Sequence, residues 1–440
     1  MARDGDSGLI AEIRSRQADP ERPILRSTAG DLTFADIAAA DRIDLSAIAP
    51  GDVVALVGDF DPRSIAALLG LIDRKAILVP LTSETKADHA YFHEAAAVNA
   101  VIEGGEVTRK SQSGLDNPML ARLRDAGHAG LVLFSSGTTG RPKAILHDLE
   151  LFLARFRTPR EALVTLSFLL FDHIGGINTL LHTLFNNGQV VVPSRRTAEA
   201  VAADILAHGV ELLPTTPTFL RMLLIGGLVP RLAGGSLRVI TYGTERMDEP
   251  TLGRLCAGLP DIDLRQTYGM SELGILRVKS EARDSLFMKV GGEGVETRIR
   301  DADNVLEIRA AGRMLGYLNA PSPFAADGWY DTRDVVEARG EFIRVVGRTS
   351  EVINVGGRKI LPGEIERAAL LHPAVALAKA MAGANPITGE HIEVRVQLRE
   401  GASVTRQELS AHFRGLLPEG LRPHRVVFET VEVGHRFKRL

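Results

Sequence analysis

The sequence predicts an α/β protein in which a large N-terminal domain, built of mostly parallel sheets covered by helices, precedes a small α+β C-terminal domain. Three observations support this prediction. The chain has 440 residues, which is enough for two or more domains. Its longer first part alternates short apolar runs with helical patterns. Near residue 348 that alternation gives way to a different order of elements, so we expect domains at residues 1–348 and 349–440.

The first expected strand–helix–strand unit spans residues 53–81. Val53–Val57 is a short apolar run, Pro62 opens a helical pattern that continues to Ile72, and a second apolar run covers Ala76–Leu81. Two buried strands joined by a helix are typical of a parallel unit. The same rhythm returns with expected strands at 131–134, 163–170, 189–193, 211–217 and 237–243, and helical patterns at 177–185 and 197–209.

The C-terminal part has its own order of elements. A strand after Glu351 is followed by a turn, a helix over Pro362–Leu371 and two strands around the sequence NPITGE. Thr405 and Glu408 have the spacing of a capping box, which predicts the start of a second helix. A last strand is expected over Arg425–Val433.

Composition excludes several kinds of partner and site. The 52 basic and 55 acidic side chains give a net charge of −3, so we expect neither nucleic acid nor an acidic membrane surface as a partner. No apolar run is long enough to span a bilayer, no secretory signal is visible, and the cytoplasm is the expected compartment. Cys256 is the only cysteine, which excludes an internal disulfide and a cysteine-based metal site, and we expect it to pack in the interior.

The most informative segment follows the expected strand Leu131–Phe134. It reads SSGTTGRPK from Ser135 to Lys143. Two glycines allow a sharp turn with inward N–H groups, four hydroxyls add donors, and the lysine adds a positive charge, which together suit a polyphosphate. The spacing is not that of a Walker A loop. The alternative is a solvated Ser/Gly turn between two strands.

This segment resembles the phosphate loop of the adenylate-forming (ANL) superfamily, which includes acyl- and aryl-CoA synthetases, nonribosomal peptide adenylation domains and luciferases. Four further motifs of that superfamily have counterparts in the same order. They are QTYGMSELG (266–274), GYLN (316–319), GWYDTRDVV (328–336) and VGRTSEVINVGGRKILPGEIE (346–366).

The resemblance implies an ATP- and Mg²⁺-dependent ligase with a mobile C-terminal domain. Such an enzyme joins a carboxylate to the α-phosphate of ATP, releases pyrophosphate and passes the acyl group of the acyl-AMP to the thiol of CoA. This chemistry needs positioning and charge neutralisation more than a protein nucleophile. The sequence agrees, since it contains no convincing Ser-His-Asp or Cys-His arrangement.

The resemblance also assigns nucleotide contacts. The β- and γ-phosphates are expected to bind to Ser135, Ser136, Gly137, Thr138, Thr139, Gly140 and Lys143. Glu272, with Thr138, is expected to hold Mg²⁺, which prefers oxygen ligands. Tyr268 is expected to stack on the adenine, with Gly243, Thr244, Glu245, Gly269, Met270 and Ser271 beside it. Asp334 is expected to accept the ribose hydroxyls and Arg348 to add a ribose or phosphate contact.

The acid is expected beside His173, in FDHIGG. Ile174, Thr216 and Gly269 complete the predicted acyl pocket, and the segment PTTPTFL (214–220) supplies a wall. His173 could instead be a core histidine bonded to the backbone. Asp172 could form a local salt bridge or face a cationic group of the substrate. A small or medium carboxylic acid is expected.

The C-terminal domain is expected to supply Lys438 to the carboxylate and α-phosphate, so the predicted catalytic residues are Lys438, Glu272, His173 and Lys143. The alternative for Lys438 is a solvated basic tail. Ser350 lies at the expected hinge, and Gly356 and Gly357 at the thiol tunnel. Four positions depart from the superfamily pattern. Tyr242, Arg333 and Phe437 stand where glycine is usual or frequent, and Ser350 stands at the hinge position.

Three functions follow from these residues. The leading one is an acyl- or aryl-CoA synthetase. The second is an adenylating enzyme that loads an acyl carrier protein or passes the acyl-adenylate to another nucleophile. The third is a non-catalytic nucleotide-binding protein. A homodimer is the base-rate expectation for the assembly.

Overall fold

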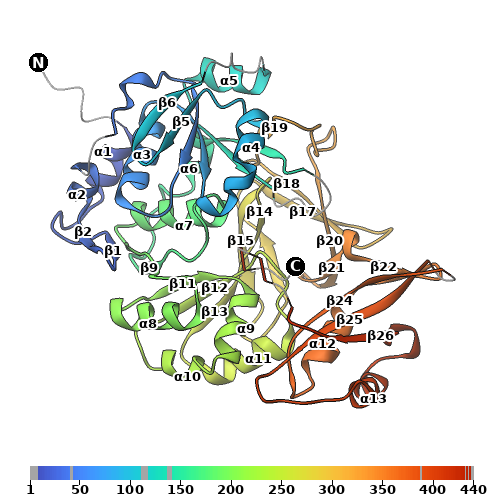
Figure 1. The fold of residues 1–440 in the computed structure, drawn as a ribbon. Helices are drawn as coiled ribbons and strands as arrows, with labels where there is room; N and C mark the ends of the chain where they lie inside the picture. The colour runs from blue at the N-terminus through green and yellow to red at the C-terminus, as the bar shows by residue number, and fades with distance from the viewer. Residues whose placement is uncertain are drawn as a thin grey trace, which may run out of the picture.

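The computed structural model describes residues 8–39, 43–110, 117–135, 141–386, 389–431, 433–434 and 436–437. Within these residues the strands form four sheets, three with seven strands and one with five. Figure 1 shows most of the first sheet and its helices in blue and cyan, the second mainly in green with its two edge strands near the N-terminus in blue, the third in yellow to orange and the fourth in orange to red. None of the described helices is both long and apolar enough to cross a membrane.

The first sheet has the strand order β19-β8-β7-β4-β3-β5-β6. Its strands are β3 (Val53–Val57), β4 (Ile77–Leu81), β5 (Ala100–Glu103), β6 (Glu106–Arg109), β7 (Gly130–Phe134), β8 (Ala144–Asp148) and β19 (Gly316–Tyr317). The accompanying helices are α1 (Leu9–Ser15), α2 (Phe34–Ala39), α3 (Pro62–Asp73), α4 (His89–Ala95), α5 (Pro118–Ala126) and α6 (Leu149–Ala154). β3 and β4 are parallel neighbours joined through α3, which confirms the predicted strand–helix–strand unit.

The second sheet has the order β13-β12-β11-β9-β10-β1-β2 and is parallel except for the β1–β2 pair. Its strands are β1 (Leu25–Ser27), β2 (Gly30–Leu32), β9 (Val164–Leu166), β10 (Gln189–Val191), β11 (Leu212–Thr215), β12 (Val239–Tyr242) and β13 (Asp263–Gln266). Its helices are α7 (Ile174–Phe185), α8 (Ala198–His208), α9 (Pro217–Ile225), α10 (Val229–Leu232) and α11 (Glu249–Gly258).

One strand of this sheet is shorter than the sequence predicts. The expected strand over 163–170 ends at Leu166, because the N–H of Phe168 bonds to the carbonyl of Leu166 in a tight turn. The residues that follow leave the sheet and run into α7. This early end places Phe168 and Leu170 on a loop, where both line a cavity.

The third sheet is antiparallel throughout and was not anticipated as a separate layer. Its order is β14-β15-β16-β21-β20-β18-β17. The strands are β14 (Tyr268–Met270), β15 (Gly274–Ser280), β16 (Met288–Gly291), β17 (Val295–Arg300), β18 (Val305–Ala310), β20 (Tyr330–Arg339) and β21 (Phe342–Arg348). Tyr268 and Leu276 belong to its apolar cluster, while Arg and Glu side chains pair across one face of the hairpin β17–β18.

The fourth sheet uses only residues from the C-terminal part of the chain. It contains β22 (Ile353–Val355), β23 (Arg358–Ile360), β24 (Val375–Asn385), β25 (Gly389–Leu398) and β26 (Arg425–Phe428), with α12 (Gly363–Leu370) and α13 (Arg406–Leu416) packed on it. The capping box predicted at Thr405 and Glu408 is present at the start of α13. The last strand ends earlier than predicted, because the N–H of Val431 bonds to the Gln397 side chain instead of continuing the ladder.

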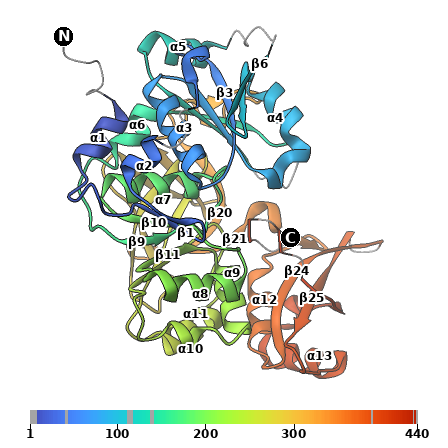
Figure 2. The same ribbon diagram turned by 60° about the vertical axis from the view of Figure 1, so that its left-hand side comes forward.

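The C-terminal sheet and its helix α12 face the large domain. Figure 2 shows α12 beside α9 and α11. Arg246, in the loop after β12, donates one hydrogen bond to the carbonyl of Val346 (2.7 Å) and one to Glu366 Oε2 (3.0 Å) on α12. Glu366 is buried, so this single arginine joins the second sheet, the third sheet and the C-terminal helix.

Candidate active site

The two ends of the predicted phosphate loop are fixed by the hairpin β7–β8. The N–H of Ser135 bonds to the carbonyl of Lys143 (3.1 Å), and the N–H of Lys143 bonds to Ser135 Oγ (3.0 Å). The strands therefore hold both ends of the loop on neighbouring positions. Five loop residues predicted to bind phosphate, Ser136, Gly137, Thr138, Thr139 and Gly140, lie outside the described residues.

Two side chains from elsewhere hold the end of this loop. Tyr91, on α4, donates its hydroxyl hydrogen to the carbonyl of Pro142 (2.8 Å). Asn319 accepts from the N–H of Ala144 (2.8 Å) and donates to Tyr91 Oη (3.0 Å). Sequence reasoning assigned no role to either residue, although Asn319 closes the GYLN motif and was visible there.

The turn that carries Glu272 is held from three positions. His147, on β8, contacts the carbonyl oxygen of Ser271 through Nε2 (2.7 Å). Complete burial lowers the pKa of His147 to about 4, so the ring is neutral at pH 7 and donates its Nε2 hydrogen to that carbonyl. The N–H of Met314 bonds to the carbonyl of Glu272 (2.8 Å), and Tyr317 donates to Glu272 Oε1 (2.8 Å).

Tyr317 connects the Glu272 turn with the phosphate loop. Burial, with the negative charge of Glu272 next to it, raises the pKa of Tyr317, so its hydroxyl stays protonated and remains a donor. The ammonium nitrogen of Lys143 lies 4.8 Å from the centre of the Tyr317 ring. A carboxylate and a cation thus converge on one aromatic side chain, next to the loop predicted to hold phosphates.

A second polar cluster lies at one edge of the third sheet. The carboxylate of Asp334, on β20, is buried and accepts the Tyr268 hydroxyl at Oδ2 (2.6 Å) and Arg348 Nε at Oδ1 (2.7 Å). Burial, followed by the charge of Asp334, raises the pKa of Tyr268 well above its usual value, so the phenol donates. Both oxygens of the Asp334 carboxylate are therefore held by donors, one from β14 and one from the end of β21. The adenine stacking predicted for Tyr268 stays a prediction.

The predicted adenine-flanking turn follows β12. A Cβ on Gly243 would lie 2.2 Å from Thr267 Oγ1, so only glycine fits there without movement. Thr244 has a positive φ of 69° and is exposed. The carboxylate of Glu245 accepts from the N–H (3.2 Å) and hydroxyl (2.9 Å) of Thr218, at the start of α9.

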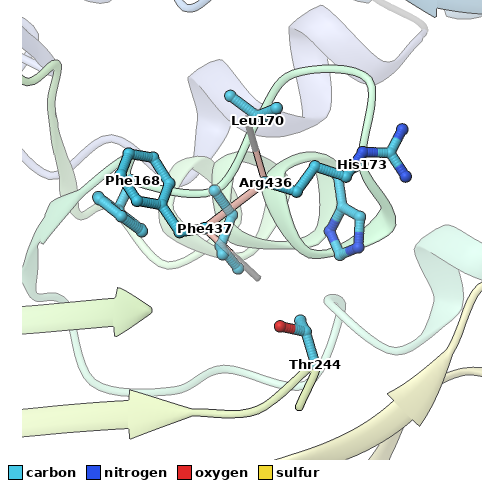
Figure 3. A pocket seen from close by; sticks show the side chains of 7 residues that line it. Phe168, Leu170, His173, Thr244, Arg436 and Phe437 are labelled. Carbon is cyan, nitrogen blue, oxygen red and sulfur yellow. The ribbon is translucent and has the colours of Figure 1, made fainter. Parts of the chain in front are cut away.

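The predicted acyl pocket is built at the first turns of two helices. His173 caps α7, because its Nδ1 accepts the N–H of Gly175 (3.0 Å), which leaves the proton of the neutral ring on Nε2. Thr216 caps α9 by accepting the N–H of Phe219 (3.1 Å). Ile174 is buried at the start of α7. Figure 3 shows His173 on one side of a cavity and Thr244 across from it, with Phe168, Leu170, Arg436 and Phe437 along the wall.

Asp172 forms an ion pair with the C-terminal tail instead of the predicted local salt bridge. Its Oδ2 lies 3.6 Å from Arg436 Nη2. Lys438, the predicted catalytic lysine, lies outside the described residues, whereas Arg436 and Phe437 just before it lie against the large domain. The sequence did not predict their contacts with the acyl pocket.

The hinge and tunnel residues lie apart from these clusters. Ser350 is exposed in a short helical turn at 349–351, between β21 and β22. Gly356 and Gly357 form the two-residue turn between β22 and β23, with φ values of 56° and 85°, which glycine adopts without strain. Cys256 is partly buried on α11 against the core of the second sheet, and burial raises the pKa of its thiol, which disfavours the thiolate.

Three departures from the superfamily pattern have structural counterparts. Arg333 and Phe437, which stand where glycine is usual, have φ values of 61° and 52°, so both keep the left-handed backbone that glycine favours. Tyr242 is buried in the core of the second sheet.

The described residues contain no group of three or more His, Cys, Asp and Glu side chains placed to hold a metal ion by themselves. A single carboxylate such as Glu272 suits Mg²⁺ that is held mainly by substrate phosphates and water. The donor set therefore fits a metal that arrives with a nucleotide.

Comparison with known proteins agrees with this arrangement. Residues 14–318 match the sequence profile of the AMP-binding enzyme family. The chain is 28% identical over 406 residues to the medium/long-chain-fatty-acid–[acyl-carrier-protein] ligase FadD10 of Mycobacterium tuberculosis, covering 82% of this chain and 73% of that protein. It is 31% identical over 353 residues to the sulfoacetate–CoA ligase of Cupriavidus necator, covering 68% and 67%. The fold resembles ATP-bound MatB from Rhodopseudomonas palustris, with a TM-score of 0.80, 20% identity, and 98% and 96% of the chains covered.

Proposed function

Because the chain belongs to the AMP-binding enzyme family of adenylate-forming ligases, we propose a residue-level mechanism for its reaction and a small carboxylic acid as its substrate. The chain is an AMP-forming acid–thiol ligase: ATP activates a carboxylic acid as an acyl-AMP, and the acyl group passes to a thiol. CoA is the proposed acceptor, with a carrier-protein phosphopantetheine as the alternative.

The phosphate side of the mechanism rests on Lys143, Glu272 and Tyr317. Lys143 and the loop that begins at Ser135 hold the β- and γ-phosphates and neutralise charge on the departing pyrophosphate. Glu272, fixed by Tyr317, holds Mg²⁺ together with Thr138, and the metal supplies further neutralisation of the phosphate oxygens when it is bound. The observation that carries this proposal is the convergence of Lys143 and Glu272 on the Tyr317 ring and hydroxyl.

The other end of the nucleotide is held by the third sheet. Asp334 accepts the ribose hydroxyls, and Arg348 holds that carboxylate in place while it contacts the ribose or α-phosphate. The turn at Gly243, Thr244 and Glu245 borders the adenine, as do Tyr268, Gly269, Met270 and Ser271. These contacts fix the α-phosphorus in one place, so an acid in the pocket can attack in line.

The acid is proposed to sit beside His173, Ile174, Thr216 and Gly269. One carboxylate oxygen bonds to the α-phosphorus, and the bond from that phosphorus to the pyrophosphate oxygen breaks. Because Nδ1 of His173 accepts the Gly175 N–H, its Nε2 hydrogen is proposed to be the one donated to the substrate carboxylate. Lys438 is proposed to stabilise charge on the same oxygens, as a compact mobile ammonium can.

We propose that the two domains divide after Arg348, where β21 ends and before the fourth sheet begins. Ser350 then lies at the hinge, and Gly356 and Gly357 line the thiol path once the C-terminal domain has rotated. A homodimer is part of the same proposal and is checked by light scattering.

The test is acid-dependent exchange of labelled pyrophosphate into ATP, measured against aliphatic, aromatic, hydroxy and amino acids. We expect exchange with at least one small acid and its loss in Glu272→Gln. A product assay with CoA, with holo-carrier protein and with neither then identifies the acceptor. Carrier loading without CoA turnover would replace CoA as the acceptor, and absence of exchange across the whole panel would favour a non-catalytic nucleotide-binding protein.

A further inference from the structure

The last described residues of the chain return from the C-terminal sheet to the large domain. The ring of Phe437 lies 4.7 Å from that of Phe168 and 5.6 Å from that of Phe219, measured between ring centres. Thr216 donates its hydroxyl hydrogen to the carbonyl of Phe437 (2.8 Å). Phe437 is therefore partly buried against the core of the second sheet, although it follows β26 of the fourth.

A buried ion pair joins this tail to the loop before α7. Asp172 is 5% exposed and Arg436 is 14% exposed, and their closest oxygen and nitrogen atoms lie 3.6 Å apart. Asp172 Oδ1 and Arg436 Nε have no hydrogen-bond partner in the described part of the chain. The pair holds the tail mainly by charge, which acts strongly at low dielectric.

The tail closes the space next to the proposed acid-binding residues. Phe437, Arg436, Leu170 and His173 line one cavity with Thr244 on its far side (Figure 3). The volume left among them is about 10 Å³, roughly enough for one water molecule. With the Phe437 ring in place, the pocket beside His173 has little room for a long acyl chain.

The backbone conformation of Phe437 would suit glycine better than phenylalanine, which points to a role for the ring itself. Its φ of 52° lies in the left-handed region, where glycine is unstrained and phenylalanine is uncommon. A glycine at this position keeps the same path of the chain and removes the ring. The ring therefore fills space at the expense of backbone strain.

We propose that Phe437 is a specificity-determining residue, supplied by the C-terminal tail, that closes the acyl pocket and restricts the enzyme to acids with short acyl groups. The Asp172–Arg436 pair holds the ring in that position. The inference rests on the proposed function and names the substrate class for the same site. One wall of the pocket then belongs to the C-terminal part, so the size limit applies while that part is docked.

The test compares full-length wild type with Phe437→Gly in acid-dependent ATP–pyrophosphate exchange. The acids are acetate, butyrate, hexanoate and octanoate. We expect wild type to prefer the shorter acids, and Phe437→Gly to raise the ratio of kcat/KM for hexanoate over acetate by about tenfold or more, since pocket methylenes each change selectivity on that scale. Asn304→Gly is the matched control, because Asn304 also has a positive φ (56°) but is exposed on the β17–β18 hairpin.

The outcomes separate the inference from the function on which it rests. If wild type supports exchange and the ratio is unchanged in Phe437→Gly, or if wild type prefers octanoate, the inference is overturned. If neither these four acids nor the wider panel of aromatic, hydroxy and amino acids supports exchange with wild type, the proposed function fails instead. Phe437→Leu is the second variant and is expected to shift the ratio less than glycine does. Asp172→Asn, which removes the partner charge of Arg436, is expected to shift it in the same direction by a smaller factor, and an unchanged ratio there would refute the anchoring role of the pair.

Discussion

The proposed ribose-binding cluster and the proposed acyl pocket are built in opposite ways. Tyr268, Asp334 and Arg348 come from strands of one antiparallel sheet, and both oxygens of the central carboxylate are bonded within it. The acyl pocket is assembled from loops of the second sheet and from the tail that follows the fourth. Its one ion pair is loose and leaves buried polar atoms without partners.

This difference separates side chains whose positions the sheet fixes from side chains whose positions depend on a loop and the tail. Groups held on neighbouring strands are positioned before the nucleotide arrives, so binding requires little reorganisation. Groups supplied by a loop and a tail change when the tail moves. The contrast predicts large, acid-independent effects from substitutions in the first region, and acid-dependent effects from substitutions in the second.

The largest effect is expected from Asp334→Asn, which removes the charge that two donors share. Hydrogen bonds to a charged group contribute about 1.5–3 kcal/mol each, so kcat/KM for ATP should fall about 100-fold. The fall should be the same for every acid in the exchange assay. Asp331→Asn, an exposed carboxylate on the same strand, is the control and should change activity little. Equal losses in the two variants, or a loss that differs between acids, would break the comparison.

The next effect concerns stability below neutral pH, in the nucleotide region. The pKa of His147 is about 4 in the folded protein, below its ordinary value of 6.5, so the unfolded chain takes up a proton first as the pH falls. The neutral His147 ring therefore contributes fully to the free energy of unfolding above pH 6.5, and this contribution is lost as the pH falls from 6.5 to 4. One pKa unit corresponds to about 1.4 kcal/mol, so between pH 7 and pH 5 this loss is about 2 kcal/mol.

His147→Gln tests that dependence, because glutamine keeps an N–H donor for the Ser271 carbonyl but does not titrate. Urea unfolding at pH 7 and pH 5 gives, for wild type and for the variant, the change in the free energy of unfolding between the two pH values. We expect the variant to lose less stability than wild type on acidification. An identical loss in both proteins would mean that His147 does not carry this part of the pH dependence.

The smallest effect is expected from Tyr268→Phe, which removes one donor to Asp334 and keeps the ring. Arg348 still neutralises the carboxylate, so kcat/KM for ATP should fall about tenfold. Tyr268→Leu also removes the aromatic face, and its kcat/KM for ATP should fall further if the ring stacks on adenine as proposed. The comparison would be sharpened by a clear gap between the two variants, whereas a Tyr268→Phe defect equal to that of Asp334→Asn would contradict the assigned roles.

Sequence motifs were informative where function depends on residues that lie close together in the chain. The strands β3 and β4 and the capping box at Thr405 followed from local patterns. The turn around Glu272 was located, but not the residues that hold it. His147 and Tyr317 contact it across more than 40 positions, and a single sequence does not show such pairings.

The acyl pocket was the least predictable region, for the same physical reason. Arg436 and Asp172 meet only because the tail folds back across the molecule. The separate third sheet was also missed, because the Arg and Glu side chains of β17–β18 mask in the sequence the apolar residues, such as Leu306 and Ile308, that these strands give to its core.

The bonds of Arg246 to Val346 and Glu366 have a consequence for the timing of catalysis. The arginine stands two residues after Thr244, at the edge of the adenine turn, and its partner carboxylate on α12 is buried. Separating α12 from the large domain requires this carboxylate to lose its counter-charge before water can replace it. On the proposed rotation of the C-terminal part, breaking this contact adds to the barrier, and the acyl-adenylate can form in the time before the thiol is admitted.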